Sequence, residues 1–238
     1  MNRQAQAVVL LLVGGAVLRA SLTDMYLRYV KQGLRPFLIA AGLTLVLAAV
    51  MTLWYEFRGI RARDDHGQDE HGHSHEPWVA WLLVLPVFAL LLVSPPALGS
   101  YAASRSGTAL QQVSDFPPLP PGDPAKISVL DYASRAVFDE GRSIGDRKVR
   151  LTGFVVKGAD GKSYLARMIL TCCAADARPV KVGLTGQVPT GLKADTWLDV
   201  TGRYVPKSVK DDINGERIPF LEVTDFQQVA APNEQYES

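Results

Sequence analysis

The feature that most constrains this chain is the uneven distribution of its apolar residues. They make up 47% of the 238 residues, but the long apolar runs all lie in the first hundred. The run Pro36–Trp54 contains no charged residue and comes close to the ~20 residues that a helix needs to cross a bilayer. It therefore predicts a membrane-spanning helix, and the surrounding part of the chain is expected to lie in a lipid bilayer.

Two further apolar runs flank this one. Asn2–Leu18 is short, and we expect it to continue through Arg19–Tyr29 as a first spanning helix. A signal peptide is the competing interpretation, but no small-x-small cleavage site follows the run. Trp78–Leu98 predicts a third span. The sequence thus predicts three transmembrane helices within residues 1–104, in a multi-pass protein of the cell membrane.

The basic residues near the ends of these helices are almost evenly divided between the two sides of the membrane. The positive-inside rule therefore favours only slightly a cytoplasmic loop between the second and third helices and an extracytoplasmic C-terminal domain. The helices carry almost no intramembrane charge, so they cannot easily line a polar path by themselves. For a transport function we therefore expect a larger multi-span partner protein.

All four histidines lie in the loop 64–76, DDHGQDEHGHSHE, which also carries five carboxylates. Imidazole nitrogen is a preferred ligand of zinc, and carboxylates fill remaining positions or attract cations. The alternative is a solvated polar turn that only joins two helices. We predict a weak, transient contact with a metal, possible zinc ligands being His66, His71, His73 and His75.

The composition changes after this region, and residues 105–126 are expected to form a proline-rich linker. Residues 127–238 are expected to form a soluble domain. Helical spacing of apolar residues predicts a helix over Ile127–Asp139, with Ser128 as its N-cap. Five strands should follow, at Val149–Val156, Tyr164–Leu170, Val180–Leu184, Trp197–Val205 and Pro219–Val229.

Two of these strands carry a glycine in the middle, Gly153 and Gly202. A mid-strand glycine permits the sharp coiling that a small barrel needs. The predicted fold class is therefore a membrane α-helical region of three helices followed by a small, closed β-barrel of the oligonucleotide/oligosaccharide-binding (OB) type. A small β-sandwich is the alternative.

The only two cysteines, Cys172 and Cys173, are adjacent and directly follow the second predicted strand. Successive side chains of a strand point to opposite faces, so both thiols can face one ion only if the chain bends after Thr171. Three interpretations remain open: small buried hydrophobes, a strained adjacent disulfide, or thiolates that ligate a soft metal with Asp176 as a third ligand.

Several enzyme classes are not indicated. A cysteine nucleophile needs a base, and every histidine lies in the loop 64–76, a predicted span and a linker away from Cys172. No glycine-rich phosphate-binding loop is present. The net charge of +1 gives no general attraction to nucleic acid. We therefore expect neither an enzyme nor a nucleic-acid-binding protein.

Three segments together resemble one protein family: CCAADA at Cys172–Ala177, VRLTGFV at Val149–Val155 and WLDVTGRYV at Trp197–Val205. With the apolar helices and the histidine-rich loop, they resemble the YcgQ-like bacterial membrane proteins. The resemblance implies a subunit of a two-component permease, encoded beside a larger multi-span permease and linked in some members with zinc homeostasis. It implies no catalytic residue.

The leading prediction is an accessory subunit of a membrane permease that is linked to divalent metal, with zinc as the candidate ion. One alternative is a membrane-tethered OB-type binding module, in which Phe154, Tyr164, Arg167 and Tyr204 would contact a polymer. The other is a thiol redox protein that uses Cys172 and Cys173, although adjacent cysteines lack the two-residue spacer of the usual dithiol motif.

Overall fold

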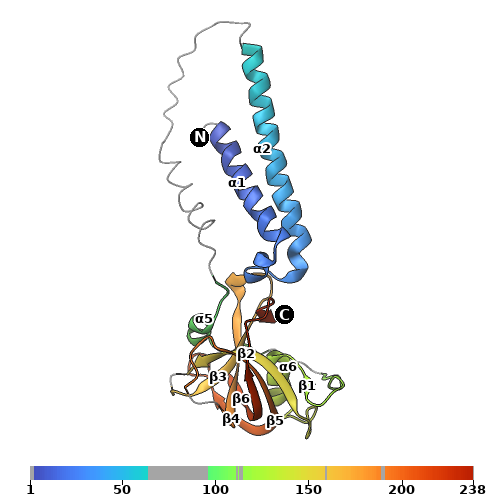
Figure 1. Cartoon of the computed structure of the whole chain (residues 1–238), viewed down its shortest axis with the longest axis vertical. Coiled ribbons are helices and arrows are strands. Elements are labelled where there is room, and N and C mark those ends of the chain that lie inside the picture. Colours follow the sequence, from blue (N-terminus) through green and yellow to red (C-terminus); the bar gives the residue numbers. More distant parts are fainter. Residues whose placement is uncertain are drawn as a thin grey trace. The chain divides into compact units, whose positions relative to one another are not determined.

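The computed structural model describes residues 3–63 and 96–237, apart from 111, 113, 114, 159, 189 and 190. The chain divides into two compact units (Figure 1). One contains Met1–Tyr26 and Gln32–Pro96, and the other contains Leu27–Lys31 and Ala97–Ser238. The short segment Leu27–Lys31 thus belongs to the second unit, although it lies between two helices of the first in sequence.

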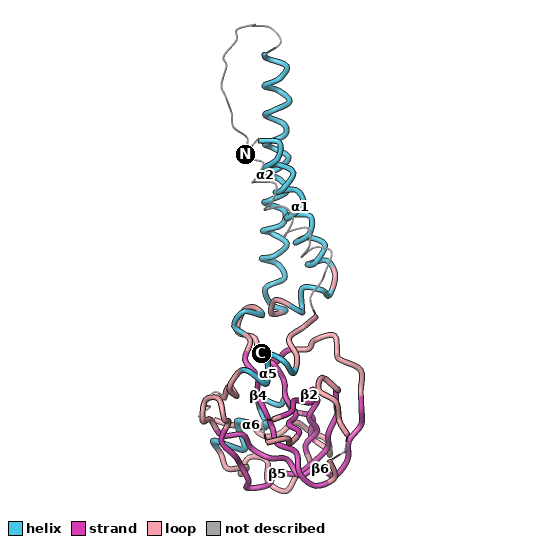
Figure 2. Tube along the Cα trace, turned by 90° about the vertical axis from the view of Figure 1, so that its left-hand side faces the viewer, coloured by secondary structure: helices cyan, strands magenta, loops and turns pink. Residues whose placement is uncertain are grey.

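The first unit is built on two helices that run side by side, α1 (Arg3–Leu22) and α2 (Arg35–Arg63) (Figure 2). Glycines let the two backbones approach closely. A Cβ atom on Gly42 would lie 2.8 Å from Cγ of Leu18, and one on Gly14 would lie 3.1 Å from the carbonyl oxygen of Gly42. Small residues at the contact are typical of helix pairs inside membranes, where close van der Waals packing replaces the hydrophobic effect.

Within the described residues, one helix is long and apolar enough to cross a membrane, Gln32–Arg58, with a mean hydropathy of 2.3. Only 11% of its apolar window is buried inside the protein, and Phe37, Leu47 and Trp54 are 70%, 63% and 56% exposed. The prediction of a span over Pro36–Trp54 agrees with this helix. Among the described residues, apolar side chains exposed over so much of one helix are typical of a surface that contacts a membrane or a protein.

The prediction of three transmembrane helices is not confirmed. The third run, Trp78–Leu98, lies mostly outside the described residues, and the apolar helix Gln6–Leu22 is shorter than a span. The expected continuation of the first helix to Tyr29 is wrong. The hydroxyl of Thr23 donates to the carbonyl of Arg19 over 3.0 Å at the end of α1, and the chain then forms a 3₁₀ turn, η1 (Asp24–Arg28).

The second unit is a closed five-stranded β-barrel. Its strands follow the ring order β2-β3-β4-β6-β5 and back to β2, because β2 pairs with both β3 and β5. The pairs around the ring are antiparallel except β4–β6, which is parallel. This closure excludes the β-sandwich alternative. The five strands are β2 (Val149–Lys157), β3 (Ser163–Ile169), β4 (Arg178–Gly186), β5 (Trp197–Lys210) and β6 (Arg217–Gln228).

The two mid-strand glycines lie where neighbouring strands leave no room for a side chain. A Cβ atom on Gly153 would lie 2.7 Å from the carbonyl oxygen of Ala166, and one on Gly202 would overlap the carbonyl group of Glu222. Gly202 also lies at a register shift between β5 and β6. Such irregularities increase local twist and bending, which small barrels need for closure.

Helix α6 (Val129–Phe138) packs Val129, Tyr132 and Ala133 on the barrel core. The hydroxyl of Tyr132 donates to the carbonyl oxygen of Phe220 in β6 over 2.6 Å. The predicted N-cap is confirmed, because the side chain of Ser128 accepts from the amide of Asp131 over 2.9 Å. Two short strands extend the sheet, β1 (Ala125–Lys126) beside β2 and β7 (Tyr236–Glu237) beside β3.

The segment expected as a linker makes specific contacts with the barrel. Thr108 is buried, and its amide donates to Asp211 over 2.8 Å. Asp211 in turn forms a buried ion pair with Lys181 in β4, at 2.9 Å. Arg147 donates to the carbonyl oxygen of Pro120 over 2.9 Å. Much of the described part of 105–126 is therefore attached to the second unit. Before it lies α5 (Ser100–Arg105), which covers a smaller apolar cluster around Met168.

Candidate functional site

The two cysteines lie in a short loop, Thr171–Asp176, which we call the dithiol loop. The chain leaves β3 at Ile169 and turns through the 3₁₀ helix η3 (Ala174–Asp176) before β4 begins. The carboxylate of Asp176 closes the loop, because it accepts from the amide of Thr171 over 3.2 Å and from that of Cys172 over 2.8 Å. The bend that the sequence required after Thr171 is present.

The structure brings Cys172, Cys173 and Asp176 into this one loop. Both cysteines are free thiols. Cys172 is exposed and Cys173 is half-buried, so the interpretation of both as buried hydrophobes is wrong for Cys172. An exposed thiol at the surface of a loop is accessible to an ion, an oxidant or a partner chain.

The electrostatics of the loop keep Cys172 protonated. A side-chain hydrogen bond with Asp176, followed by one with Cys173, raises the pKa of Cys172 to about 11. The hydrogen bond from the Cys172 thiol, helped by backbone amides, lowers the pKa of Asp176 below its ordinary value. The loop therefore holds a carboxylate and a neutral thiol at neutral pH. A neutral thiol is a poor nucleophile, which disfavours the thiol redox interpretation.

The segment Leu27–Lys31 pairs with the dithiol loop. Val30 forms an antiparallel bridge with Cys173, and the amide of Lys31 donates to the carbonyl oxygen of Cys172 over 3.1 Å. The amide of Ala174 donates to the carbonyl oxygen of Tyr29 over 2.7 Å. The backbone of the loop is thus held on a second stretch of chain.

Nearby, one phenol connects three segments of the second unit. The hydroxyl of Tyr236 donates to the carbonyl oxygen of Arg28 and accepts from the amide of Leu98, each over 2.9 Å. Tyr236 belongs to β7, which pairs with β3. The C-terminal strand is therefore tied to the segment that follows α1 and to the segment that precedes α5.

Within the described ranges, no group of three or more His, Cys, Asp or Glu side chains is arranged to hold a metal ion. The oxygens of Asp176 already accept backbone amides, which leaves the two thiols without a third protein ligand in that loop. The histidine ligands predicted between His66 and His75 lie outside the described residues. Zinc binding therefore stays a prediction, supported by the soft donor chemistry of the thiols rather than by an assembled site.

The residues considered for polymer binding do not form an exposed stacking surface. Phe154, Tyr164 and Arg167 are 1%, 7% and 8% exposed. Phe154 packs edge-on against Trp197 with ring centroids 5.5 Å apart, and Tyr204 is half-buried against the core. Because single-stranded polymers are bound on accessible aromatic rings, these residues do not support that alternative.

Residues 137–237 match the family model of the DUF1980 C-terminal domain. The match covers less than half of the chain, but it contains all five barrel strands, the dithiol loop and β7. No curated protein and no solved structure matches the chain. The DUF1980 match is consistent with the resemblance found in the sequence, and the assignment to YcgQ-like permease subunits stays a prediction.

Sequence reasoning missed part of the polar chemistry of this domain. The side-chain hydrogen bonds that involve Glu237 and Tyr236 join residues between 69 and 208 positions apart in sequence. No local pattern indicates such contacts. A usable signal existed for Arg167 and for Lys181, because a charged residue in the middle of a buried strand is rare unless it is paired.

Proposed function

We propose that this chain is a membrane-anchored accessory subunit of a larger permease, and that its dithiol loop contacts a divalent metal such as zinc. The single observation that carries the proposal is the pairing of the dithiol loop with Tyr29–Lys31. Lys31 is followed directly by Gln32, the first residue of the candidate span Gln32–Arg58. If this helix spans the membrane as proposed, chain connectivity supports a position of the thiols a few residues from its boundary, where an ion would enter or leave a permease.

The apolar helices support the anchoring and the partner. The α1–α2 pair leaves large apolar side chains exposed over most of α2, and a helix of this kind in a soluble protein would be buried. In the part of the chain that the structure describes, one candidate span and one shorter apolar helix supply few polar groups for a conducting path. A path would have to be formed by a second, larger protein, which matches the two-component permease implied by the family resemblance.

The barrel order supports an OB-type assignment for the second unit. Numbering the five barrel strands in chain order gives the ring 1-2-3-5-4, with the parallel pair between strands three and five. This is the strand order of OB barrels. The barrel then acts as a rigid support for the loop after its second strand, while polymer binding is disfavoured because the candidate aromatic residues are buried.

Zinc titration of the full-length protein in detergent tests the metal half of the proposal. After treatment with a chelator, competition with a chromophoric zinc indicator should give a dissociation constant in the micromolar range. The double variant Cys172→Ser, Cys173→Ser should weaken binding about tenfold or more, because serine lacks the soft sulfur ligand. The exposed carboxylate variant Asp212→Asn is the matched control and should not change it. Equal zinc affinity of the wild type, the double cysteine variant and Asp212→Asn would exclude the dithiol loop as the zinc site.

A separate experiment tests the accessory role. Tagged full-length protein is cross-linked in native membranes and purified. We expect it to remain in the membrane fraction after alkaline washing and to recover a larger multi-span protein. Release of the chain into the aqueous fraction, or recovery of the chain alone at every cross-linker concentration, would contradict the role whatever the zinc titration shows.

A further inference from the structure

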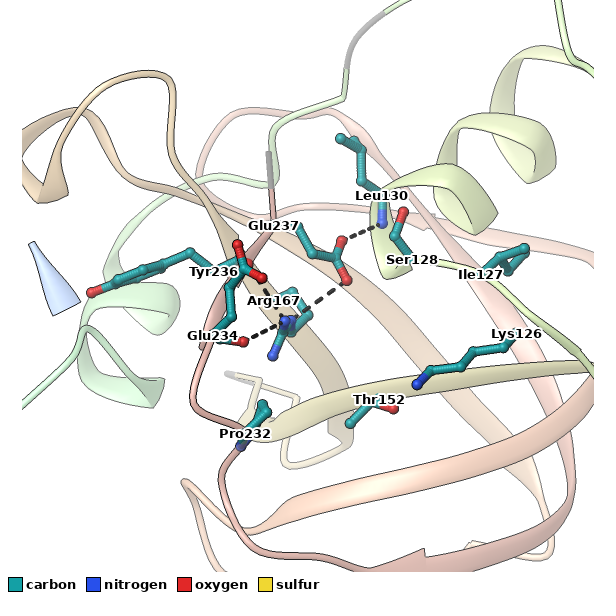
Figure 3. Close-up of a pocket in the computed structure, with 10 residues that line it drawn as sticks. All are labelled: Lys126, Ile127, Ser128, Leu130, Thr152, Arg167, Pro232, Glu234, Tyr236 and Glu237. Atoms are coloured by element: carbon teal, nitrogen blue, oxygen red, sulfur yellow. Dashed lines mark hydrogen bonds and ion pairs between the residues drawn. The ribbon is translucent and has the colours of Figure 1, made fainter. Parts of the chain in front are cut away.

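A cavity of about 530 Å³ lies in the second unit where the start of α6, the strand β3 and the C-terminal segment meet. Figure 3 shows the guanidinium of Arg167 at the centre of the lining residues, with Lys126 and Thr152 on one side and Pro232 on another. The volume is within the range of small-molecule sites. The dithiol loop takes no part in it.

Arg167 is held rigidly in the wall of this cavity. Its Nη2 donates to the carbonyl oxygens of Glu234, over 3.0 Å, and Tyr236, over 3.5 Å. Its Nε lies 3.5 Å from a carboxylate oxygen of Glu237, and its guanidinium lies 5.0 Å from the ring centroid of Trp197. Four separate contacts therefore fix the orientation of the side chain.

One end of this guanidinium is not satisfied. Arg167 is only 8% exposed, yet its Nη1 has no hydrogen-bond acceptor among the residues that the structure describes. Buried donors are nearly always paired, and leaving one unpaired costs free energy. In Figure 3 a terminal nitrogen of Arg167 that no dashed line reaches lies on the side of Pro232 and Thr152, within the ring of lining residues. An acceptor supplied by a ligand would satisfy it.

Glu237 does not fill this role, because its carboxylate is already engaged. Its two oxygens accept from the amides of Val129 and Leu130, each over 2.9 Å, at the start of α6. The charge of the Arg167–Glu237 pair is therefore balanced within the protein. The additional positive charge at the cavity comes from Lys126, an exposed residue of β1 whose side chain extends toward Thr152 in Figure 3.

The charges around the cavity select the kind of anion. Lys126 and Arg167 are cationic, while Glu234 and Glu237 are anionic and line the same cavity. A doubly charged phosphate would be repelled by the two carboxylates, whereas a single carboxylate needs only the free Nη1 donor and the ammonium group. Ile127, Leu130 and Pro232 supply apolar wall beside these groups.

We propose that this cavity binds a small monocarboxylic acid with an apolar body. The carboxylate of the ligand accepts hydrogen bonds from Nη1 of Arg167 and from the ammonium group of Lys126. Its apolar body packs against Pro232, which lies on the same side of Arg167 as the free nitrogen in Figure 3. Binding is reversible and involves no covalent step, so the barrel is a sensor or carrier of organic acids in addition to any role of the dithiol loop.

Calorimetric titration of the full-length protein in detergent tests this proposal, with benzoate and hexanoate as probes. At least one of them should bind with a stoichiometry of one, while benzamide, the neutral analogue of benzoate, should bind at least about tenfold more weakly. Inorganic phosphate should bind more weakly than the better carboxylate. No binding of either carboxylate, equal binding of benzamide, or tighter binding of phosphate would overturn the proposal.

Variants locate the binding in this cavity. Lys126→Ala removes an exposed side chain and should weaken carboxylate binding about tenfold without lowering the melting temperature. Lys193→Ala removes another exposed lysine that does not line the cavity and should have no effect. Arg167→Lys should abolish binding. If Arg167→Lys does not fold, the comparison of Lys126→Ala with Lys193→Ala tests the site by itself. Equal affinities of these two variants for the carboxylate would exclude this cavity as the binding site.

Discussion

Two carboxylates of the second unit, Asp176 and Glu237, have the same hydrogen-bond pattern and opposite pKa shifts. Each accepts from two consecutive backbone amides, Thr171 and Cys172 for Asp176 and Val129 and Leu130 for Glu237. The pKa of Asp176 is lowered, chiefly by the hydrogen bond from the Cys172 thiol. The pKa of Glu237 is raised, because loss of hydration outweighs the two amides and Arg167. The degree of burial therefore decides whether the pKa of the carboxylate is raised or lowered.

The difference separates two kinds of polar site. In the dithiol loop Cys172 is exposed and Cys173 and Asp176 are half-buried, so water can replace much of the hydrogen bonding that the protein loses. Around Glu237 water is largely excluded, so each group depends on its protein partner and an unsatisfied donor such as Nη1 of Arg167 is costly. Binding at the dithiol loop therefore depends mainly on the chemistry of the ligand. Binding at the buried site depends on whether the ligand pairs with protein donors or acceptors that lack a partner.

The largest expected effect comes from removing the buried carboxylate. Glu237→Ala leaves the guanidinium of Arg167 buried without its counter-ion and removes two acceptors from the start of α6. We expect a loss of ~3 kcal/mol in the free energy of unfolding. Urea unfolding of the full-length protein in detergent, followed by tryptophan fluorescence, measures it. Asp176→Ala is the control at a half-buried carboxylate that has no buried counter-ion, and it should change the midpoint much less. Similar midpoint shifts in the two variants would show that burial does not distinguish the two carboxylates in stability.

A second, smaller effect is the pH dependence of stability. The folded-state pKa of Glu237 lies above its ordinary value of 4.5, so the unfolded chain releases this proton first as the pH rises. This group therefore lowers stability as the pH rises from about 4.5 to the folded-state pKa, with a slope of at most ~1.4 kcal/mol per pH unit. Below this window it has no effect, and above it the penalty is constant.

Melting temperatures of wild type and Glu237→Gln between pH 4 and 8 isolate that contribution. The difference between the two proteins should change with pH inside the window and be flat outside it. Asp176→Asn, compared with wild type in a separate series below pH 4, should show the opposite sign, because the stability from a lowered pKa is present above the ordinary value of 3.8 and is lost as the pH falls through the folded-state pKa. A pH-independent difference for Glu237→Gln would show that its carboxyl titrates as in the unfolded chain.

The smallest expected effect is on thiol reactivity. Asp176 is the main reason that the pKa of Cys172 is about 11 rather than 9.0. Asp176→Asn in a Cys173→Ser background should therefore raise the alkylation rate of Cys172 by iodoacetamide at pH 7.5 about tenfold, since more thiolate is offset in part by lower nucleophilicity. Mass spectrometry of the modified peptide gives the rate. An unchanged rate would show that the carboxylate does not control this thiol.

Much of the barrel could be predicted from sequence because its signals are local. Alternating apolar residues indicated all five strands, and their ends in the structure differ mainly by extension, as in β5, which continues from Val205 to Lys210. Gly153 and Gly202 indicated tight coiling, and Ser128 indicated the start of α6. Each of these features depends on the conformation of a few neighbouring residues.

The rest could not be predicted because it depends on contacts between distant parts of the chain. Nothing near Glu237 indicates that it caps a helix 108 residues away, and nothing near Val30 indicates a bridge to Cys173. The end of α1 was also missed, since hydropathy does not register the hydroxyl of Thr23. For the candidate sites, residue chemistry indicated Cys172 and Asp176, while the cavity around Arg167 is defined only by the assembled fold.

The two hydrogen bonds of the Tyr236 hydroxyl connect three segments of the second unit mechanically. The chain enters the second unit twice, close to Arg28 after α1 and close to Leu98 before α5. The backbone at both places is hydrogen-bonded to the hydroxyl oxygen of Tyr236. A force on either segment would therefore act first on β7. This strand pairs with β3 at only two residue positions. The next residue, Glu237, carries the carboxylate that lies 3.5 Å from Nε of Arg167, so a displacement of β7 would change the shape of the cavity around Arg167.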